Sequence, residues 1–148
     1  MTIQKNYLLA IVRITVLALW IILMPILFML AQLLRIPGHK KLVPLFHAGT
    51  CRILGIITTV SGTMSKAKPA LYVSNHISYI DIFVLGQIPA FFIAKSEVSG
   101  WPVFGKLAEF QNTLFIERNP RKAKAQLDIL KSYLEKGKSL TFFPEGTS

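Results

Sequence analysis

A histidine and an aspartate, two residues that could perform acid–base chemistry, interrupt an otherwise apolar stretch of the chain. His76 and Asp81 are five positions apart, and on a regular helix such side chains point in directions about 140° apart. They can meet only if His76 lies in the turn before a helix and Asp81 lies in its first turns. Asp81 would then accept from one ring nitrogen and fix the tautomer, so that the other nitrogen could take a proton from a hydroxyl.

A structural interpretation of the same residues stands beside this catalytic one. Asn75 has a side chain that suits a helix cap, and His76 could be a partly buried histidine whose polar atoms are satisfied. The pair by itself does not exclude this interpretation. The remaining polar positions of the chain are therefore needed to decide between the two.

Two further polar clusters follow in apolar surroundings, namely Phe115-Ile116-Glu117-Arg118 and Phe143-Pro144-Glu145-Gly146-Thr147. Asn75-His76-x4-Asp81 comes first in the chain, and these two clusters follow it. In order and approximate spacing, the three segments resemble the first three motifs of the lysophospholipid acyltransferases, typified by 1-acylglycerol-3-phosphate acyltransferase. Ala94-Lys95-Ser96-Glu97 is similar to the family's linker between the first two motifs. The chain differs at Ser148, where the family usually has arginine, and in lacking the fourth, proline-containing motif.

The resemblance implies transfer of a fatty acyl group from acyl-CoA or acyl-carrier protein to the free hydroxyl of a lysophospholipid. The simplest such acceptor is 1-acylglycerol-3-phosphate, which would give phosphatidic acid in phospholipid biosynthesis. In this reaction His76 is the base and Asp81 orients it, with no protein nucleophile and no metal or cofactor beyond the acyl donor. The acceptor and its phosphate would be bound by Arg118, Glu145, Gly146 and Thr147.

Two supporting residues complete the predicted site. Asn75 precedes the histidine, and Lys95 follows a predicted strand, where we expect it to stabilise the oxyanion or the phosphate. Arg118 carries a planar, permanently charged group that suits bidentate contact with a phosphate, although a surface ion pair is its structural alternative. The segment from Pro144 to Thr147 is by itself a typical turn sequence. Only the resemblance assigns it to acceptor binding.

Three alternatives to this function remain open. Ser148, in place of arginine, leaves room for a lyso-lipid without a phosphate, such as an amino-acid lipid. A serine hydrolase could use Ser74, Ser78 or Ser96 with the histidine, although the chain has no Gly-x-Ser-x-Gly elbow. The third alternative is a membrane-binding protein without turnover.

Composition and charge point to a membrane. Of the 148 residues 52% are hydrophobic, the mean hydropathy is +0.49, and the formal net charge is +10. No acidic residue precedes Asp81, so the apolar first third is flanked only by basic side chains, which suits an anionic lipid surface. Nucleic acid is a less suitable partner, because the aromatic residues lie in apolar runs rather than among the basic ones. The single Cys51 excludes an internal disulfide and fits a reducing compartment.

Residues 14–34 are the predicted membrane anchor. They contain no charged residue and would extend about 31 Å as a helix, against a hydrocarbon core of about 30 Å. Pro25 would kink this helix, so it could either span the bilayer or enter a single leaflet. Basic residues flank both ends of this segment. The slight excess after it favours a cytoplasmic C-terminal side, in a bacterial-type inner membrane. We therefore predict membrane-associated helices over residues 1–57 and a catalytic domain over residues 58–148.

The catalytic domain is predicted to be α/β, a mixed sheet with flanking helices. Leu71-Tyr72-Val73 reads as a buried strand that delivers His76 to its carboxyl end, where open α/β sheets place their chemistry. Residues 58–64 are expected to form a short strand or a bulge, and further strands are expected over residues 90–94, 112–116 and 140–143. A helix buried nearly all round is expected at residues 80–84, and another helix between Asn119 and Gly137. The chain stops directly after a strand and a turn, so we expect it to be truncated at its C-terminus.

Overall fold

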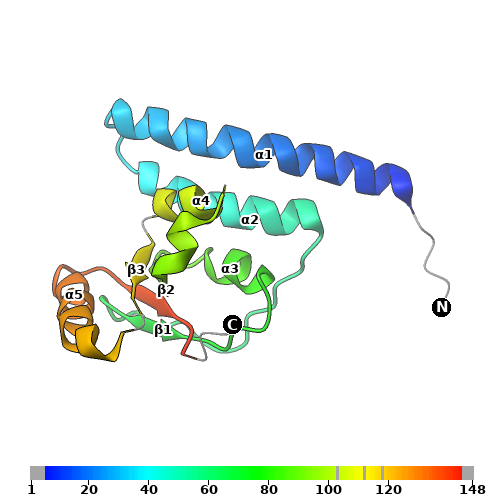
Figure 1. Ribbon diagram of the computed structural model, residues 1–148. Helices are drawn as coiled ribbons and strands as arrows, with labels where there is room; N and C mark the ends of the chain where they lie inside the picture. The colour runs from blue at the N-terminus through cyan, green and yellow to red at the C-terminus, as the bar shows by residue number, and fades with distance from the viewer. Residues whose placement is uncertain (1–5, 103, 112, 118, 145–148) are drawn as a thin grey trace.

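The computed structural model describes residues 6–102, 104–111, 113–117 and 119–144. Two long helices precede a small α/β unit (Figure 1). The helices are α1 (Tyr7–Leu33), α2 (Leu42–Leu54), α3 (Ile80–Leu85), α4 (Phe104–Phe110) and α5 (Ala123–Glu135), with short 3-10 turns η1 (His39–Lys41), η2 (Ser96–Gly100) and η3 (Pro120–Lys122). The strands are β1 (Leu71–Val73), β2 (Phe91–Lys95), β3 (Leu114–Ile116) and β4 (Leu140–Phe142).

The four strands form one sheet in the order β1-β4-β2-β3. Each described pairing is parallel, with Val73 opposite Phe142 and Lys95 opposite Ile116. The α/β class is confirmed, but the pairings are parallel where a mixed sheet was expected, because a helical segment returns the chain before each new strand. The carboxyl ends of all four strands consequently lie along one edge of the sheet.

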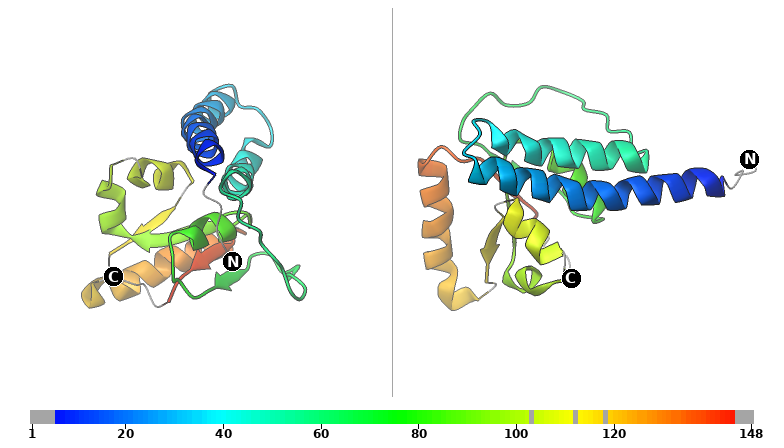
Figure 2. Two further views of the ribbon diagram at one scale, coloured as in Figure 1. Left: turned by 90° about the vertical axis from the view of Figure 1, so that its right-hand side faces the viewer. Right: turned by 90° about the horizontal axis from the view of Figure 1, so that it is seen from above.

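The helices α1 and α2 pack as an antiparallel pair above the sheet, with α2 between α1 and the α/β unit (Figures 1 and 2). The indole Nε1 of Trp20 donates to the carbonyl oxygen of Phe46 at 3.1 Å. A Cβ atom at Gly49 would lie 2.3 Å from the Trp20 ring, so only glycine admits the indole at this point. Along α1 the buried residues Met24, Phe28 and Ala31 form one stripe, and most of the rest of that helix is exposed.

The helix α1 begins earlier than the predicted anchor, at Tyr7, and includes Arg13 and Pro25. The Asn6 side chain caps it by accepting from the N–H of Leu9 at 3.0 Å. Among the described residues it is the one helix that is long and apolar enough to cross a membrane. The exposed apolar surface of α1 is what a helix in contact with lipid requires.

Three expected elements differ from the structure. The strand β1 was expected to be buried, but it lies at the edge of the sheet, with Leu71 and Val73 52% and 60% exposed. Residues 58–64 form no strand, and Ile57 and Val60 are 92% and 78% exposed, because no neighbouring strand supplies hydrogen bonds there. The helix α3 is half-buried rather than buried all round, with Ile80 46% exposed. The end of α5 agrees with expectation, since Gly137 adopts a left-handed conformation with φ of 72°.

The core below α2 contains a histidine that is buried among aromatic rings. His47 is 0% exposed, and among the described residues neither ring nitrogen has a hydrogen-bond partner. The rings of Phe83 and Phe92 lie 5.8 and 6.2 Å from it, and a Cβ at Gly86 would lie 2.4 Å from the imidazole. Burial lowers the pKa of His47 to about 4, and the nearby Gln111 side chain opposes this shift.

Because the pKa of His47 is lowered in the folded protein, we expect the free energy of unfolding to depend on pH. The unfolded chain binds a proton on His47 below its ordinary pKa of 6.5, whereas the folded chain binds one only near pH 4. Stability therefore falls as the pH drops from 6.5 to 4, by about 3 kcal/mol from this residue. Denaturant unfolding of the detergent-solubilised protein across this range should show a steeper pH slope for wild type than for His47→Phe, and equal slopes would contradict the assignment.

Candidate active site

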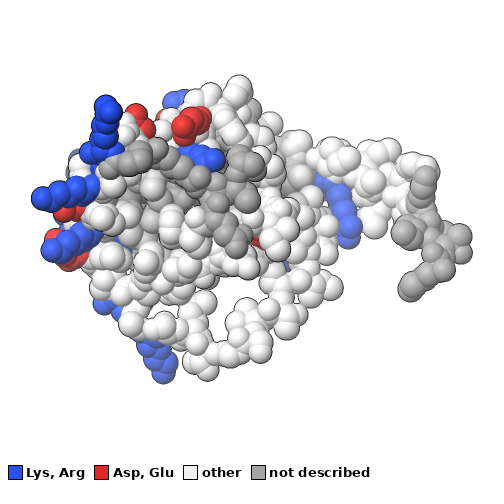
Figure 3. All heavy atoms as spheres, turned by 60° about the horizontal axis from the view of Figure 1, so that its bottom comes forward, with Lys and Arg blue, Asp and Glu red and all other residues white. Residues whose placement is uncertain are grey.

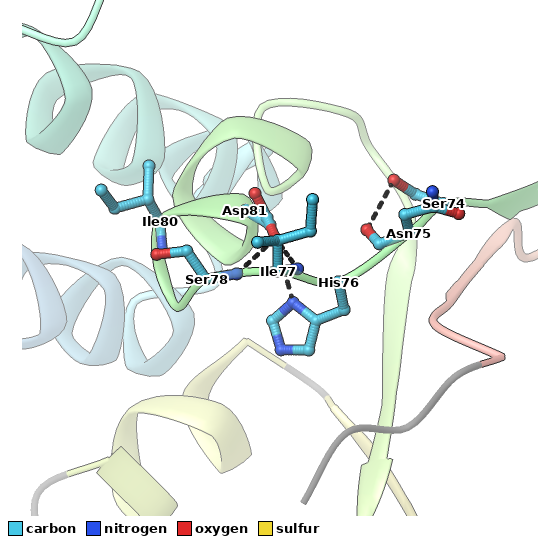
Figure 4. A network of polar contacts seen from close by, with 7 residues as sticks. All are labelled: Ser74, Asn75, His76, Ile77, Ser78, Ile80 and Asp81. Carbon is cyan, nitrogen blue, oxygen red and sulfur yellow. Dashed lines mark hydrogen bonds and ion pairs between the residues drawn. The ribbon is translucent and has the colours of Figure 1, made fainter.

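His76 and Asp81 are in contact at the junction between β1 and α3. The imidazole Nδ1 lies 3.3 Å from Oδ2 of Asp81 (Figure 4). The histidine is in the loop that leaves β1, and the aspartate is in the first turn of α3, as the five-residue spacing predicted. The distance is slightly longer than an ordinary N–H···O hydrogen bond, as catalytic contacts often are before substrate binds.

The same carboxylate oxygen fixes the loop backbone. Oδ2 of Asp81 accepts from the N–H groups of Ile77 and Ser78 at 2.8 and 2.9 Å. The Ser78 hydroxyl in turn accepts from the N–H of Ile80 at 3.2 Å, at the start of α3. These hydrogen bonds to Asp81 stabilise the turn and hold His76 at a defined place before the helix.

The charge of Asp81 determines which nitrogen of His76 carries the proton. Burial raises the pKa of the Asp81 carboxyl, but the N–H groups of Ser78 and Ile77 and the contact with His76 outweigh it and lower that pKa below its ordinary value. Asp81 is therefore ionised at neutral pH and can only accept a hydrogen bond. The proton of a neutral imidazole consequently lies on Nδ1, and Nε2 is the basic nitrogen.

The pair is accessible from solvent, and an aromatic ring covers one face of the imidazole. The side chains of His76 and Asp81 are 19% and 32% exposed. The Phe143 ring stacks on the imidazole with centroids 4.2 Å apart and planes 24° apart. This arrangement allows an acceptor hydroxyl to reach the histidine while the ring orientation stays restricted.

The other predicted site residues fall into two groups. Lys95 ends β2 in register with Ile116, so it lies at the sheet edge that also carries the His76 loop. Asn75 is exposed in that loop, and its carbonyl oxygen accepts from the Ser74 hydroxyl at 3.0 Å. The remaining predicted residues lie outside the described part of the chain, namely Arg118, Glu145, Gly146 and Thr147.

The three serines considered as nucleophiles have other partners. Ser74 donates to the Asn75 carbonyl, Ser78 accepts from the Ile80 N–H, and Ser96 donates to the Glu97 carboxylate at 3.3 Å. This geometry does not favour a serine nucleophile. In the described ranges, no group of three His, Cys, Asp or Glu side chains could hold a metal ion.

Sequence reasoning missed the role of Phe143, which entered only as part of a motif. The ring reaches His76 because β4 pairs directly with β1, with Phe142 opposite Val73. The residues that follow these two positions therefore leave the sheet side by side. Strand order was the missing signal, and it could not be read from local sequence patterns.

Comparison with known proteins identifies the family. The family model described as Acyltransferase matches residues 57–148, which is more than half of the chain. The chain belongs to the acyltransferase family.

Two relatives of this acyltransferase chain act on different lyso-lipids. A lyso-ornithine lipid O-acyltransferase of Rhodobacter capsulatus is 40% identical over 116 residues, which are 75% of this chain and 42% of that protein. A 1-acyl-sn-glycerol-3-phosphate acyltransferase of Neisseria meningitidis is 33% identical over 100 residues, which are 62% of this chain and 39% of that protein. The chain thus spans less than half the length of these relatives.

A solved structure shows the same fold. The 1-acyl-sn-glycerophosphate acyltransferase from Thermotoga maritima matches with a TM-score of 0.72 over 97% of this chain and 61% of that chain. At 23% identity the likeness concerns the fold, including the helices that precede the sheet.

Because the Asp81 carboxylate accepts hydrogen bonds from the loop backbone, we expect its removal to loosen the loop. In Asp81→Ala the N–H groups of Ile77 and Ser78 lose their acceptor, so their amide hydrogen exchange should accelerate about tenfold or more. Asp128→Ala, which removes an exposed carboxylate from α5, should leave both amides unchanged. Site-resolved hydrogen exchange measures this, and unaltered protection in Asp81→Ala would show that the carboxylate does not hold the turn.

Proposed function

We propose that this chain transfers a fatty acyl group from a thioester, acyl-CoA or acyl-carrier protein, to the free hydroxyl of a lyso-lipid. The observation that carries the proposal is the contact of His76 with the ionised Asp81 at the carboxyl edge of the sheet. An oriented imidazole is the group that this reaction requires, and the family membership of the chain supports acyl transfer over other uses of such a base.

In the proposed reaction the lyso-lipid attacks the thioester directly. Nε2 of His76 takes the hydroxyl proton while the hydroxyl oxygen bonds to the thioester carbonyl carbon, giving a tetrahedral oxyanion. The oxyanion collapses, the carbon–sulfur bond breaks, and the imidazolium returns the proton to the leaving thiolate. Asp81 stays ionised and stabilises the imidazolium, so the products are the acylated lipid and a free thiol.

The supporting residues are assigned to the oxyanion and to the acceptor. Lys95 would stabilise the oxyanion or an acceptor phosphate, since it ends the strand β2 at the same sheet edge. Arg118 would bind an anionic head group. The acceptor would be bound by Glu145, Gly146 and Thr147. Glu145 would contact the hydroxyl groups of the acceptor, and Gly146, which has no side chain, would let the acceptor approach the backbone. Asn75 would support this site.

Two acceptors are candidates, and the sequence favours the one without a phosphate. Lyso-ornithine lipid O-acyltransferases of Rhodobacter capsulatus and Brucella abortus are 40% and 41% identical over 75% of the chain. A 1-acyl-sn-glycerol-3-phosphate acyltransferase of Neisseria gonorrhoeae is 39% identical over only 51% of the chain. Ser148 also stands where the resemblance would place arginine. We therefore propose lyso-ornithine lipid first and 1-acylglycerol-3-phosphate second.

The proposed location is a bacterial inner membrane, with the catalytic part on the cytoplasmic side. The apolar α1 supports membrane association, and Arg35, Lys40 and Lys41 follow it directly, as the positive-inside rule requires for that side. Most of the Lys and Arg side chains visible in Figure 3 lie at the end of the molecule opposite the start of α1, with acidic side chains among them. Membrane lipids are then both the surroundings and the substrates.

A transfer assay tests this function. The full-length protein in liposomes should acylate lyso-ornithine lipid faster than 1-acylglycerol-3-phosphate when given a labelled acyl thioester. His76→Ala and Asp81→Asn should each lower kcat about 10²–10⁴-fold, because one removes the base and the other its orienting charge.

Controls separate the alternatives. A fluorophosphonate probe should not label the protein, because the proposed reaction has no acyl-enzyme. Labelling that depends on Ser74, Ser78 or Ser96 would support a hydrolase instead. Lipid binding without turnover at any enzyme level would contradict an enzymatic function.

A further inference from the structure

Three aromatic rings form a column that begins at the His76 imidazole and extends into the core. The imidazole of His76 stacks on Phe143 at 4.2 Å, and Phe143 lies over Phe92 at 6.1 Å with the two ring planes only 15° apart. The rings come from three segments, the loop after β1, the residue after β4 and the strand β2. The sheet order β1-β4-β2 brings these segments side by side.

The lower part of this column is rigid. Phe92 and Phe143 are 7% and 9% exposed, so core packing restricts both phenyl rings. Phe92 belongs to β2, which pairs with strands on both sides, and His47 lies against it at 6.2 Å. Phe143 therefore presents a fixed aromatic face to His76.

The contacts of His76 with Asp81 and Phe143 restrict different motions of its ring. Asp81 meets the imidazole at its edge, at Nδ1, and one hydrogen bond still allows the ring plane to rotate about that contact. Phe143 meets the imidazole on its face, which opposes this rotation. Together they define the direction in which Nε2 points, and the phenyl face also attracts the positive charge that the imidazole gains during transfer.

We propose that Phe143 is a positioning residue for acyl transfer, which holds the plane of the His76 imidazole so that Nε2 faces the acceptor hydroxyl. This inference rests on the proposed function and deepens it. It assigns Phe143 a role beyond filling the core, because small errors in the placement of a reacting group reduce rates strongly while leaving substrate binding intact.

A neighbouring phenylalanine provides a matched control. Phe91 precedes Phe92 on β2, and its ring contacts Tyr133 of α5 at 5.9 Å. Because side chains alternate along a strand, Phe91 lies on the sheet face opposite the aromatic column. Phe91→Leu removes one aromatic ring from the sheet without touching His76.

The experiment compares Phe143→Leu, Phe143→Tyr and Phe91→Leu in the full-length protein with its lyso-lipid and acyl thioester. Phe143→Leu should lower kcat about 10- to 100-fold with KM changed less than about twofold, since only the base is misplaced. Phe143→Tyr should restore kcat to within about threefold, because it keeps the aromatic face. Phe91→Leu should leave kcat within about twofold.

Nuclear magnetic resonance of the histidine ring gives a readout that does not depend on turnover. In wild type the ring current of Phe143 should shift the carbon-bound protons of His76 upfield from those of a histidine peptide, and Phe143→Leu should remove the shift. An unshifted His76 in the wild-type protein would overturn the stack without any substitution.

The outcomes distinguish this inference from the proposed function. If wild type transfers no acyl group, or if His76→Ala remains active, the proposed function fails whatever the ring shows. If transfer depends on His76 but Phe143→Leu keeps full kcat, the positioning role fails alone. Equal losses in Phe143→Leu and Phe91→Leu would also overturn it, because both would then reflect the sheet rather than the stack.

Discussion

The carboxylate of Asp81 is the interaction on which the rest of the site depends. One oxygen accepts from two backbone N–H groups of the loop and faces the imidazole of His76. A short loop between a strand and a helix has several accessible conformations, and these bonds select one. The same charge that closes the turn also fixes the histidine tautomer, so loop structure and basicity have one cause.

Much of the fold could be predicted from hydrophobic pattern, but strand pairing could not. The long apolar helix, the strands near Val73, Ala94, Ile116 and Phe142, and the glycine that ends α5 all followed from periodicity and turn residues. The order β1-β4-β2-β3 did not follow, because short apolar strands of a parallel sheet look alike locally. The β-branched residues 58–64 were expected to form a strand, yet without a pairing partner their propensity has no effect.

For the candidate site, too, the local contact could be predicted from the sequence, and the contact that depends on strand pairing could not. The contact of His76 with Asp81 followed from their spacing, since only a turn before a helix brings residues five apart together. The stack on Phe143 depends on β4 lying beside β1, which is a property of the whole sheet. The roles of Arg118, Glu145, Gly146 and Thr147 stay predictions, as they lie outside the described residues.

The tautomer of His76 tests the role of Asp81 most directly. It can be measured by nitrogen-15 resonance of the ring at about pH 8, where an ordinary histidine is neutral. We expect a proton on Nδ1, directed at Asp81, with Nε2 unprotonated, and loss of this preference in Asp81→Asn. A proton on Nε2 in the wild-type protein would contradict this expectation, because that nitrogen could not then act as the base.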